Sequence, residues 1–140
     1  MAAMTASTLA FPNPRGLNVL DVVLSDADVS SREAVFDAVA DAVADAVGCH
    51  QGAIRAALRD REAIGSTAVI PGLALPHGAV EGLEQPILID IALEQALRWA
   101  ANHDPVNRCL CLLFPAGDED AHLALLAEAA RRAGAPVEGK

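Results

Sequence analysis

The chain has 140 residues, of which 53% are hydrophobic and only 3% aromatic, a size and composition that fit one domain with an aliphatic core. Its formal net charge of −9 argues against a nucleic-acid partner, because binding a polyanion normally requires a basic surface. No apolar run reaches the roughly 20 residues that a transmembrane helix needs, and the first residues lack the basic and apolar regions of a secretory signal. These features favour a cytoplasmic protein without direct membrane insertion.

The first third of the chain predicts an arm, a strand and a helix. Residues 1–16 show no regular pattern and are expected to form a flexible arm, whereas the apolar run 19–24 is compatible with a strand or a helical turn. Ser30-Ser31-Arg32-Glu33 resembles a capping box that begins a helix, and Gly48 is placed to end it. Two stripes recur every four residues along that helix, one apolar (Val35, Val39, Val43, Val47) and one acidic (Asp37, Asp41, Asp45).

The remaining pattern alternates helices with apolar strands. A second helix is predicted over 51–59, and glycine and proline then mark 61–86 as loop and short strand. The apolar runs 87–93 and 108–114 predict two strands that are buried on both faces. A last helix is expected to begin at Asp118-Glu119-Asp120 and to end at Gly134. Its predicted inner face consists of Leu123, Leu126, Ala127 and Ala130. Interleaved helices and strands indicate a single α/β layered domain.

The three cysteines do not predict a disulfide framework or a metal site. Cys109 and Cys111 lie two positions apart on a predicted strand and therefore share one face, where small core side chains are the expected reading. A zinc site needs CxxC-type spacing with further ligands, and Cys49 does not supply it.

His77 is the strongest candidate for chemistry. It lies between Pro76, which has a fixed φ, and Gly78, which lets another backbone approach closely. Neutral imidazole is nucleophilic, and its ordinary pKa of roughly 6.5 makes that form available near pH 7. On this local pattern alone, a loop histidine without a function remains an alternative.

The surrounding motifs resemble those of the mannitol/fructose-type enzyme IIA family of the phosphotransferase system, including its nitrogen-regulatory branch. Arg61-Glu62, Ser66-Thr67 and the run Gly72-Leu73-Ala74-Leu75-Pro76-His77-Gly78 are similar to the family signature in order and spacing. Downstream, Asp104-Pro105-Val106 with Phe114-Pro115, and Ala121-His122-Leu123, resemble two further family segments. The resemblance covers roughly residues 19–134.

The resemblance implies a mixed β-sheet flanked by helices on both sides, in a domain spanning 17–140 that is short at its C-terminus. It implies that Nε2 of His77 accepts a phosphoryl group from phospho-HPr, with Arg61 and His122 stabilising the transferred group. Ser66, Thr67 and Glu62 are expected to support this site, the two hydroxyls by shaping the turn. No metal or cofactor is expected. The partners implied are HPr and either an enzyme IIB or a regulatory target, and a homodimer is a further alternative.

Three functions remain as alternatives. The first is a sugar phosphotransferase carrier, and the second is a nitrogen-related regulatory protein controlled by phosphorylation of His77. The absence of a fused IIB domain favours the second. A zinc hydrolase using His50, His77, His103 and His122 is disfavoured, because the sequence lacks HExxH or comparable ligand spacing. His50 and His103 are otherwise expected to be surface residues, and Trp99 to be a packing residue.

Overall fold

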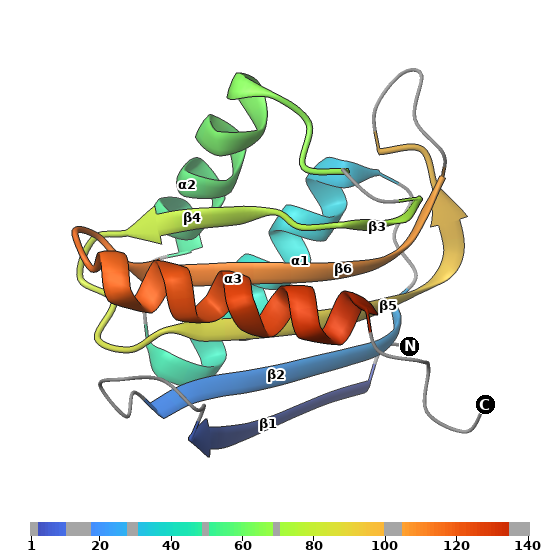
Figure 1. The fold of residues 1–140 in the computed structure, drawn as a ribbon. Helices are drawn as coiled ribbons and strands as arrows, with labels where there is room; N and C mark the ends of the chain where they lie inside the picture. The colour runs from blue at the N-terminus through green and yellow to red at the C-terminus, as the bar shows by residue number, and fades with distance from the viewer. Residues whose placement is uncertain are drawn as a thin grey trace.

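The computed structural model describes residues 3–10, 18–27, 31–48, 51–68, 71–99 and 105–134. In these ranges it contains six strands and three helices (Figure 1). The strands are β1 (Ala3–Ala10), β2 (Asn18–Ala27), β3 (Gly72–Ala74), β4 (His77–Val80), β5 (Ile87–Leu97) and β6 (Val106–Pro115). The helices are α1 (Arg32–Val47), α2 (Gln51–Ile64) and α3 (Glu119–Gly134).

The strands form one mixed sheet in the order β1-β2-β5-β6-β3, with β4 also paired to β6. β2 runs parallel to β5, β5 antiparallel to β6, and β3 and β4 parallel to β6. Because β3 pairs with the first part of β6 and β4 with its last part, these two short strands together make one edge of the sheet (Figure 1). This edge carries His77.

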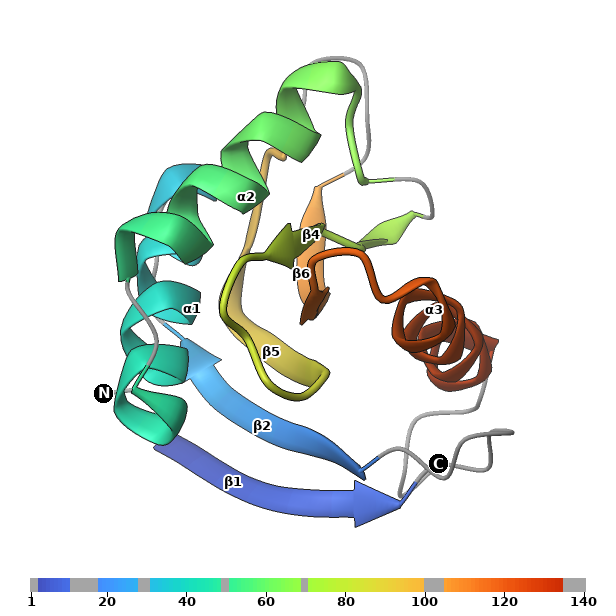
Figure 2. The same cartoon turned by 90° about the vertical axis from the view of Figure 1, so that its left-hand side faces the viewer.

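The central strands are buried on both faces, as their apolar sequences predict. In β5, Ile87, Ile89 and Ile91 belong to the core beneath α1 and α2, whereas Leu88 belongs to the core beneath α3. β6 alternates in the same way. Figure 2 shows α1 and α2 on one side of the sheet and α3 on the other. The predicted mixed sheet with helices on both sides is therefore confirmed.

The predicted arm is wrong for residues 3–10, which form β1 and pair with β2 in antiparallel register. The edge of β2 offers backbone partners that a reading of local pattern cannot anticipate. The second helix is also longer than predicted, since α2 continues to Ile64 and includes Arg61 and Glu62.

The cap of α1 lies one residue later than the predicted box. The hydroxyl of Ser31 accepts a hydrogen bond from the backbone N–H of Ala34 at 3.0 Å. Glu33, expected to close the box, instead accepts a hydrogen bond from Arg59 of α2 at 2.9 Å. Gly48 ends the helix as predicted, with a φ of 74°.

The inner face of α3 differs from the prediction. Ala121, Leu125 and Ala129 are buried, whereas Leu123, at 63% exposed, and Ala127 point outward. Both stripes are apolar and spaced by about one turn, so the helix sequence alone does not distinguish them. The sheet surface formed by Leu88, Leu110 and Leu112 selects the buried one.

A charged cluster links the last turns of α3 to the sheet. Asp90 of β5 accepts two hydrogen bonds from Arg108 of β6, at 3.0 and 2.9 Å, and lies 3.7 Å from Arg132. Glu128, only 5% exposed, accepts hydrogen bonds from both Arg131 and Arg132 at 2.9 Å. Three guanidinium groups here meet two carboxylates.

Candidate phosphoryl-transfer site

An open pocket of about 490 Å³ lies where the C-terminal half of α2, strand β4, the end of β6 and the start of α3 meet. It is lined by Ala57, Asp60, Arg61, Ile64, His77, Gly78, Ala79, Phe114 and His122. The fold thus brings together Arg61, His77 and His122, three residues that the sequence places far apart.

His77 is held at the sheet edge by backbone contacts on both sides. The Pro76 carbonyl accepts a hydrogen bond from the N–H of Leu112 in β6 at 2.9 Å. On the next residue, a Cβ added to Gly78 would lie only 2.9 Å from Cβ of Ala57 in α2. The glycine therefore permits the close approach of α2, as predicted, and this approach brings Arg61 within reach of the imidazole.

Both ring nitrogens of His77 have a hydrogen-bond partner. Nδ1 lies 3.0 Å from the carbonyl oxygen of Leu75, and the Nε–H of Arg61 donates to Nε2 at 3.1 Å. Because arginine can only donate, Nε2 must be the acceptor and carry the lone pair, and the proton must lie on Nδ1. The geometry selects the tautomer in which Nε2 is the nucleophile.

Arg61 lies in the last turn of α2 and contacts only uncharged acceptors within the part of the chain that the structure describes. Besides His77, its Nη1 donates to the carbonyl oxygen of Gly65 at 2.9 Å. No carboxylate among the described residues pairs with it, so its charge is available to an anionic ligand.

The pKa of His77 is lowered from its ordinary value. Burial is the main cause, and the positive charge of Arg61 and the neighbouring His122 act in the same direction. The hydrogen bond with Leu75 and, less strongly, the negative charge of Glu62 oppose these effects without reversing them. The neutral ring is therefore favoured at neutral pH.

His122 faces His77 from the first turn of α3, with ring centroids 5.8 Å apart. The ring of Phe114 in β6 stacks on the ring of His122, with ring centroids 4.2 Å apart and planes inclined by 6°. The backbone N–H of His122 donates to the carbonyl oxygen of Asp118 at 3.2 Å. Only the imidazole of His122 faces the pocket.

Phe114 and the Leu75 carbonyl were not identified as site elements in the sequence. The signal for Phe114 was the strand period, since Leu110 and Leu112 share its face toward α3. The role of the Leu75 carbonyl could not be predicted from the type of residue, because every residue has a backbone carbonyl.

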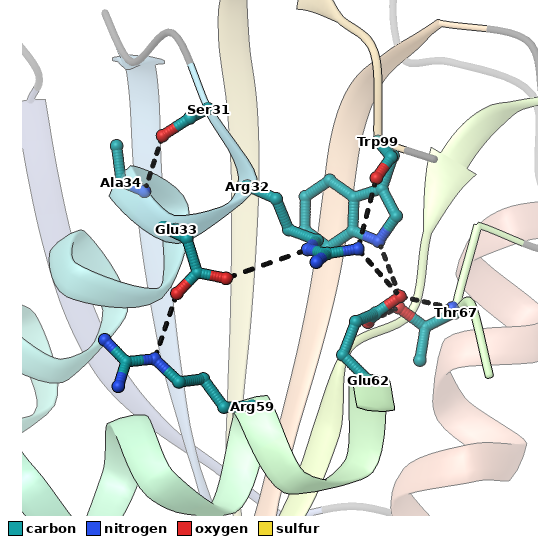
Figure 3. A network of polar contacts seen from close by, with 8 residues as sticks. All are labelled: Ser31, Arg32, Glu33, Ala34, Arg59, Glu62, Thr67 and Trp99. Carbon is teal, nitrogen blue, oxygen red and sulfur yellow. Dashed lines mark hydrogen bonds and ion pairs between the residues drawn. The ribbon is translucent and has the colours of Figure 1, made fainter. Parts of the chain in front are cut away.

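The three predicted supporting residues do not line the pocket. Ser66 accepts a hydrogen bond from the N–H of Ala68 at 3.0 Å and shapes the turn after α2. Thr67 and Glu62 are both buried and hydrogen-bonded to one another (Figure 3). Their side chains bind one another at the turn after α2 and do not line the pocket.

Of the remaining histidines and cysteines, the structure describes Cys109 and Cys111, and neither lines this pocket. His50, His103 and Cys49 lie outside the described residues. Cys109 and Cys111 are fully buried in the sheet, where burial raises the pKa of Cys109 to about 12 and that of Cys111 well above its usual value. Within the described ranges, no three His, Cys, Asp or Glu side chains gather closely enough to hold a metal ion. Trp99 is a packing residue, edge-on to Phe36.

Known proteins with related sequences carry regulatory names. The chain is 30% identical over 112 residues to a nitrogen regulatory protein of Bradyrhizobium diazoefficiens, covering 79% of this chain and 73% of that protein. It is 33% identical over 78 residues to a nitrogen regulatory protein of Escherichia coli, covering 54% of this chain and 48% of that protein.

Structure and family comparisons agree with these relatives. The crystal structure of nitrogen regulatory protein IIA-Ntr from Neisseria meningitidis superimposes with a TM-score of 0.70 and 25% identity, covering 84% of this chain and 77% of that one. Residues 17–135 match the family described as phosphoenolpyruvate-dependent sugar phosphotransferase system, EIIA 2. The chain therefore belongs to the type-2 enzyme IIA family of the phosphotransferase system.

Proposed function

We propose that this chain is a phosphoryl carrier that accepts a phosphoryl group from phospho-HPr on Nε2 of His77. The observation that carries the proposal is the pairing of Nε2 with the Nε–H of Arg61 at 3.1 Å, in an open pocket, while Nδ1 is held by Leu75. A nucleophilic lone pair beside an arginine without a carboxylate partner in the described chain is suited to a trigonal, anionic phosphoryl group.

The transfer exchanges one P–N bond for another. The donor ring carries a proton on the nitrogen that is not phosphorylated. The Nε2 lone pair attacks phosphorus, the P–N bond to the donor ring breaks, and its electron pair returns to that ring, which leaves as neutral imidazole. His77 keeps its proton on Nδ1 and becomes a phosphoimidazolium, whose positive charge the Leu75 carbonyl stabilises. No proton has to leave the site.

Arg61 changes its partner during this step. Its Nε–H now occupies the direction from which phosphorus must approach Nε2. In the proposed mechanism the guanidinium turns from the lone pair to the phosphoryl oxygens, while its bond to the Gly65 carbonyl restricts how far it moves. His122, at 5.8 Å between ring centres, offers a ring N–H to the same oxygens.

Phosphorylation in a reconstituted system tests this function. With enzyme I, HPr and phosphoenolpyruvate, intact-mass measurement should show one acid-labile phosphoryl group on the wild-type chain and none on His77→Ala. His122→Ala should still be phosphorylated, but more slowly, because it retains the nucleophile. A wild-type chain that gains no phosphoryl group, or a label that survives in His77→Ala, contradicts the proposal.

The phosphoryl group then passes to an enzyme IIB or acts as a regulatory signal. The names of the relatives, nitrogen regulatory proteins in two organisms, favour the regulatory role. Pull-downs with wild type, His77→Ala and His77→Asp distinguish the two: a regulator should retain different partners with each variant, whereas an identical set would weigh against regulation. Transfer from the phosphorylated chain to an enzyme IIB would support the sugar pathway instead.

The site of action proposed for this carrier is the cytoplasm. Across the ranges described above, no helix is both long and apolar enough to cross a bilayer. Fractionation of cells that express the chain tests this placement.

A further inference from the structure

Glu62 is a buried carboxylate that the pocket does not use. It is 7% exposed and lies next to Arg61 on α2, but unlike Arg61 it does not line the pocket. Burying a carboxylate costs free energy unless hydrogen bonds and opposite charge compensate for it. This carboxylate has both.

The partners of Glu62 come from three separate segments (Figure 3). Its two oxygens accept hydrogen bonds from the N–H of Thr67 at 2.9 Å and from the Thr67 hydroxyl at 2.7 Å. The indole N–H of Trp99 donates at 3.1 Å, and Arg32 lies 3.9 Å away. Glu62 therefore fixes the turn after α2 to the body of the protein.

That turn is connected to the imidazole by two further hydrogen bonds. The Thr67 carbonyl accepts from the N–H of Leu75 at 2.9 Å, and the Leu75 carbonyl lies 3.0 Å from Nδ1 of His77. A continuous path thus runs from the Glu62 carboxylate through Thr67 and Leu75 to the ring nitrogen opposite the nucleophile.

We propose that Glu62 is a positioning residue for phosphoryl transfer, which acts through Thr67 and Leu75 to hold the imidazole of His77 in its Nδ1–H tautomer and orientation. The inference rests on the proposed function of His77. Two adjacent residues of α2 then control the two ring nitrogens of His77. Arg61 contacts Nε2 directly, and Glu62 acts on Nδ1 through the turn that follows the helix.

Two substitutions of Glu62 distinguish the effect of its hydrogen bonds from the effect of its charge. A glutamine at this position can accept from the two N–H groups with its oxygen and donate its amide N–H to the Thr67 hydroxyl, which can also accept. Glu62→Gln should therefore preserve the path, whereas Glu62→Ala should break it. Thr67→Val removes only the hydroxyl bond and should have a smaller effect.

The first readout needs no phosphoryl donor. In the unphosphorylated protein, ¹⁵N NMR of the His77 ring should show one Nδ1–H tautomer in wild type and Glu62→Gln. In Glu62→Ala the second tautomer should appear, and the Nδ1 proton should exchange with water about tenfold faster, because its acceptor is no longer fixed.

The second readout is the rate of phosphorylation by phospho-HPr and, separately, by the small donor phosphoramidate. Glu62→Ala should be slower by about tenfold with both donors, and Glu62→Gln within about twofold of wild type, as expected when a nucleophile is misplaced by a fraction of an ångström. Glu33→Ala is the matched control, because Glu33 contacts Arg32 and Arg59 of the same network but not Thr67. It should leave both readouts unchanged.

These outcomes separate the two proposals. If phospho-HPr fails to label even the wild type, the proposed function is wrong, while the tautomer measurement still decides the role of Glu62. A folded Glu62→Ala with wild-type tautomer and proton exchange overturns the inference, as does a Glu62→Gln as impaired as the alanine variant. If thermal melting shows that Glu62→Ala does not fold, Thr67→Val decides, and an unaltered Nδ1 proton in that variant overturns the inference.

Discussion

The pocket and the charged cluster at the end of α3 both contain arginines, but they use them differently. Arg108, Arg131 and Arg132 all contact Asp90 or Glu128 within 3.7 Å or less. Arg61 contacts only a neutral imidazole nitrogen and a backbone carbonyl among the residues described. Each guanidinium group of the charged cluster contacts a carboxylate, whereas that of Arg61 contacts none among the described residues.

This difference indicates what each region does. Paired charges hold α3 against β5 and β6, so their contribution belongs to stability and is modest where the pair is exposed. An arginine without a carboxylate partner gains no ion pair in the folded protein, and its charge remains available to bind an anionic ligand. We therefore expect variants in the pocket to lower the rate of phosphoryl transfer, and variants in the charged cluster to lower the free energy of unfolding.

The largest effect is expected for Arg61→Gln. Losing the guanidinium removes the charge that meets the phosphoryl oxygens, and the rate of transfer from phospho-HPr should fall about a thousandfold. The free energy of unfolding should change by less than about 0.5 kcal/mol, because no ion pair is broken. Arg131→Gln, at a side chain that is 68% exposed, is the matched control and should leave the rate unchanged. Equal rates for the two variants would end the distinction between the regions.

Gly78→Ala should slow transfer about a hundredfold by moving α2 away from β4. Its new Cβ would approach the Ala57 side chain to 2.9 Å, which displaces Arg61 from Nε2 of His77. Gly65→Ala tests whether any glycine near the site has this effect, since its Cβ would meet no atom within 4 Å. Single-turnover phosphorylation of both variants measures the difference, and a wild-type rate for Gly78→Ala would show that the helix spacing is unimportant.

Glu128→Ala should reverse the pattern seen for Arg61. It removes the carboxylate that both Arg131 and Arg132 contact, and the free energy of unfolding should fall by about 2 kcal/mol, reduced from the cost of a fully buried pair because Arg131 is exposed. The transfer rate should stay within about twofold of wild type. Urea denaturation together with the phosphorylation assay checks both halves, and a large loss of rate would link α3 to the chemistry.

Acid should also affect this region. Burial opposes ionisation of Glu128, but the hydrogen bonds from Arg131 and Arg132 outweigh it and lower the pKa of its carboxyl group. Because the pKa of Glu128 is lower in the folded state than in the unfolded state, where it is roughly 4.3, the carboxylate stabilises the fold at pH values above 4.3. This stabilisation is lost as the pH falls through the pKa of the folded state. Urea denaturation of wild type and Glu128→Gln from pH 3 to 6 measures this, and the variant should lose less stability in acid.

The smallest effect is the pH dependence of the site itself. Burial lowers the pKa of His77 from its ordinary value of roughly 6.5. The transfer rate should therefore remain constant as the pH falls to about 6.5 and slightly below, and it should decline only at lower pH, where the ring becomes protonated. Arg61→Gln should move the midpoint upward, since a cation that lowers the pKa is removed. NMR titration of the His77 ring measures the midpoint in both proteins. A midpoint above 6.5 in wild type would contradict the burial effect.

Elements with strong periodicity were predictable from the sequence, and those defined by long-range contacts were not. The stripe of α1, the end of that helix at Gly48 and the strands around Ile89 and Cys111 follow from spacing and local conformation. β1 and the inner face of α3 were missed, because a sheet edge and the shape of an opposing surface decide them.

The sequence by itself determined the chemistry available to this protein: a histidine between proline and glycine, an arginine upstream and a second histidine downstream, in motifs of one family. Only the tertiary structure decided how these groups are used. The Leu75 carbonyl and Arg61 together fix the tautomer of His77, Gly78 lets α2 approach, and the neighbouring residues Arg61 and Glu62 bind different groups, the imidazole and the turn after α2. The physical reason is that hydrogen-bond direction and close packing depend on residues far apart in the chain, which local sequence pattern does not encode.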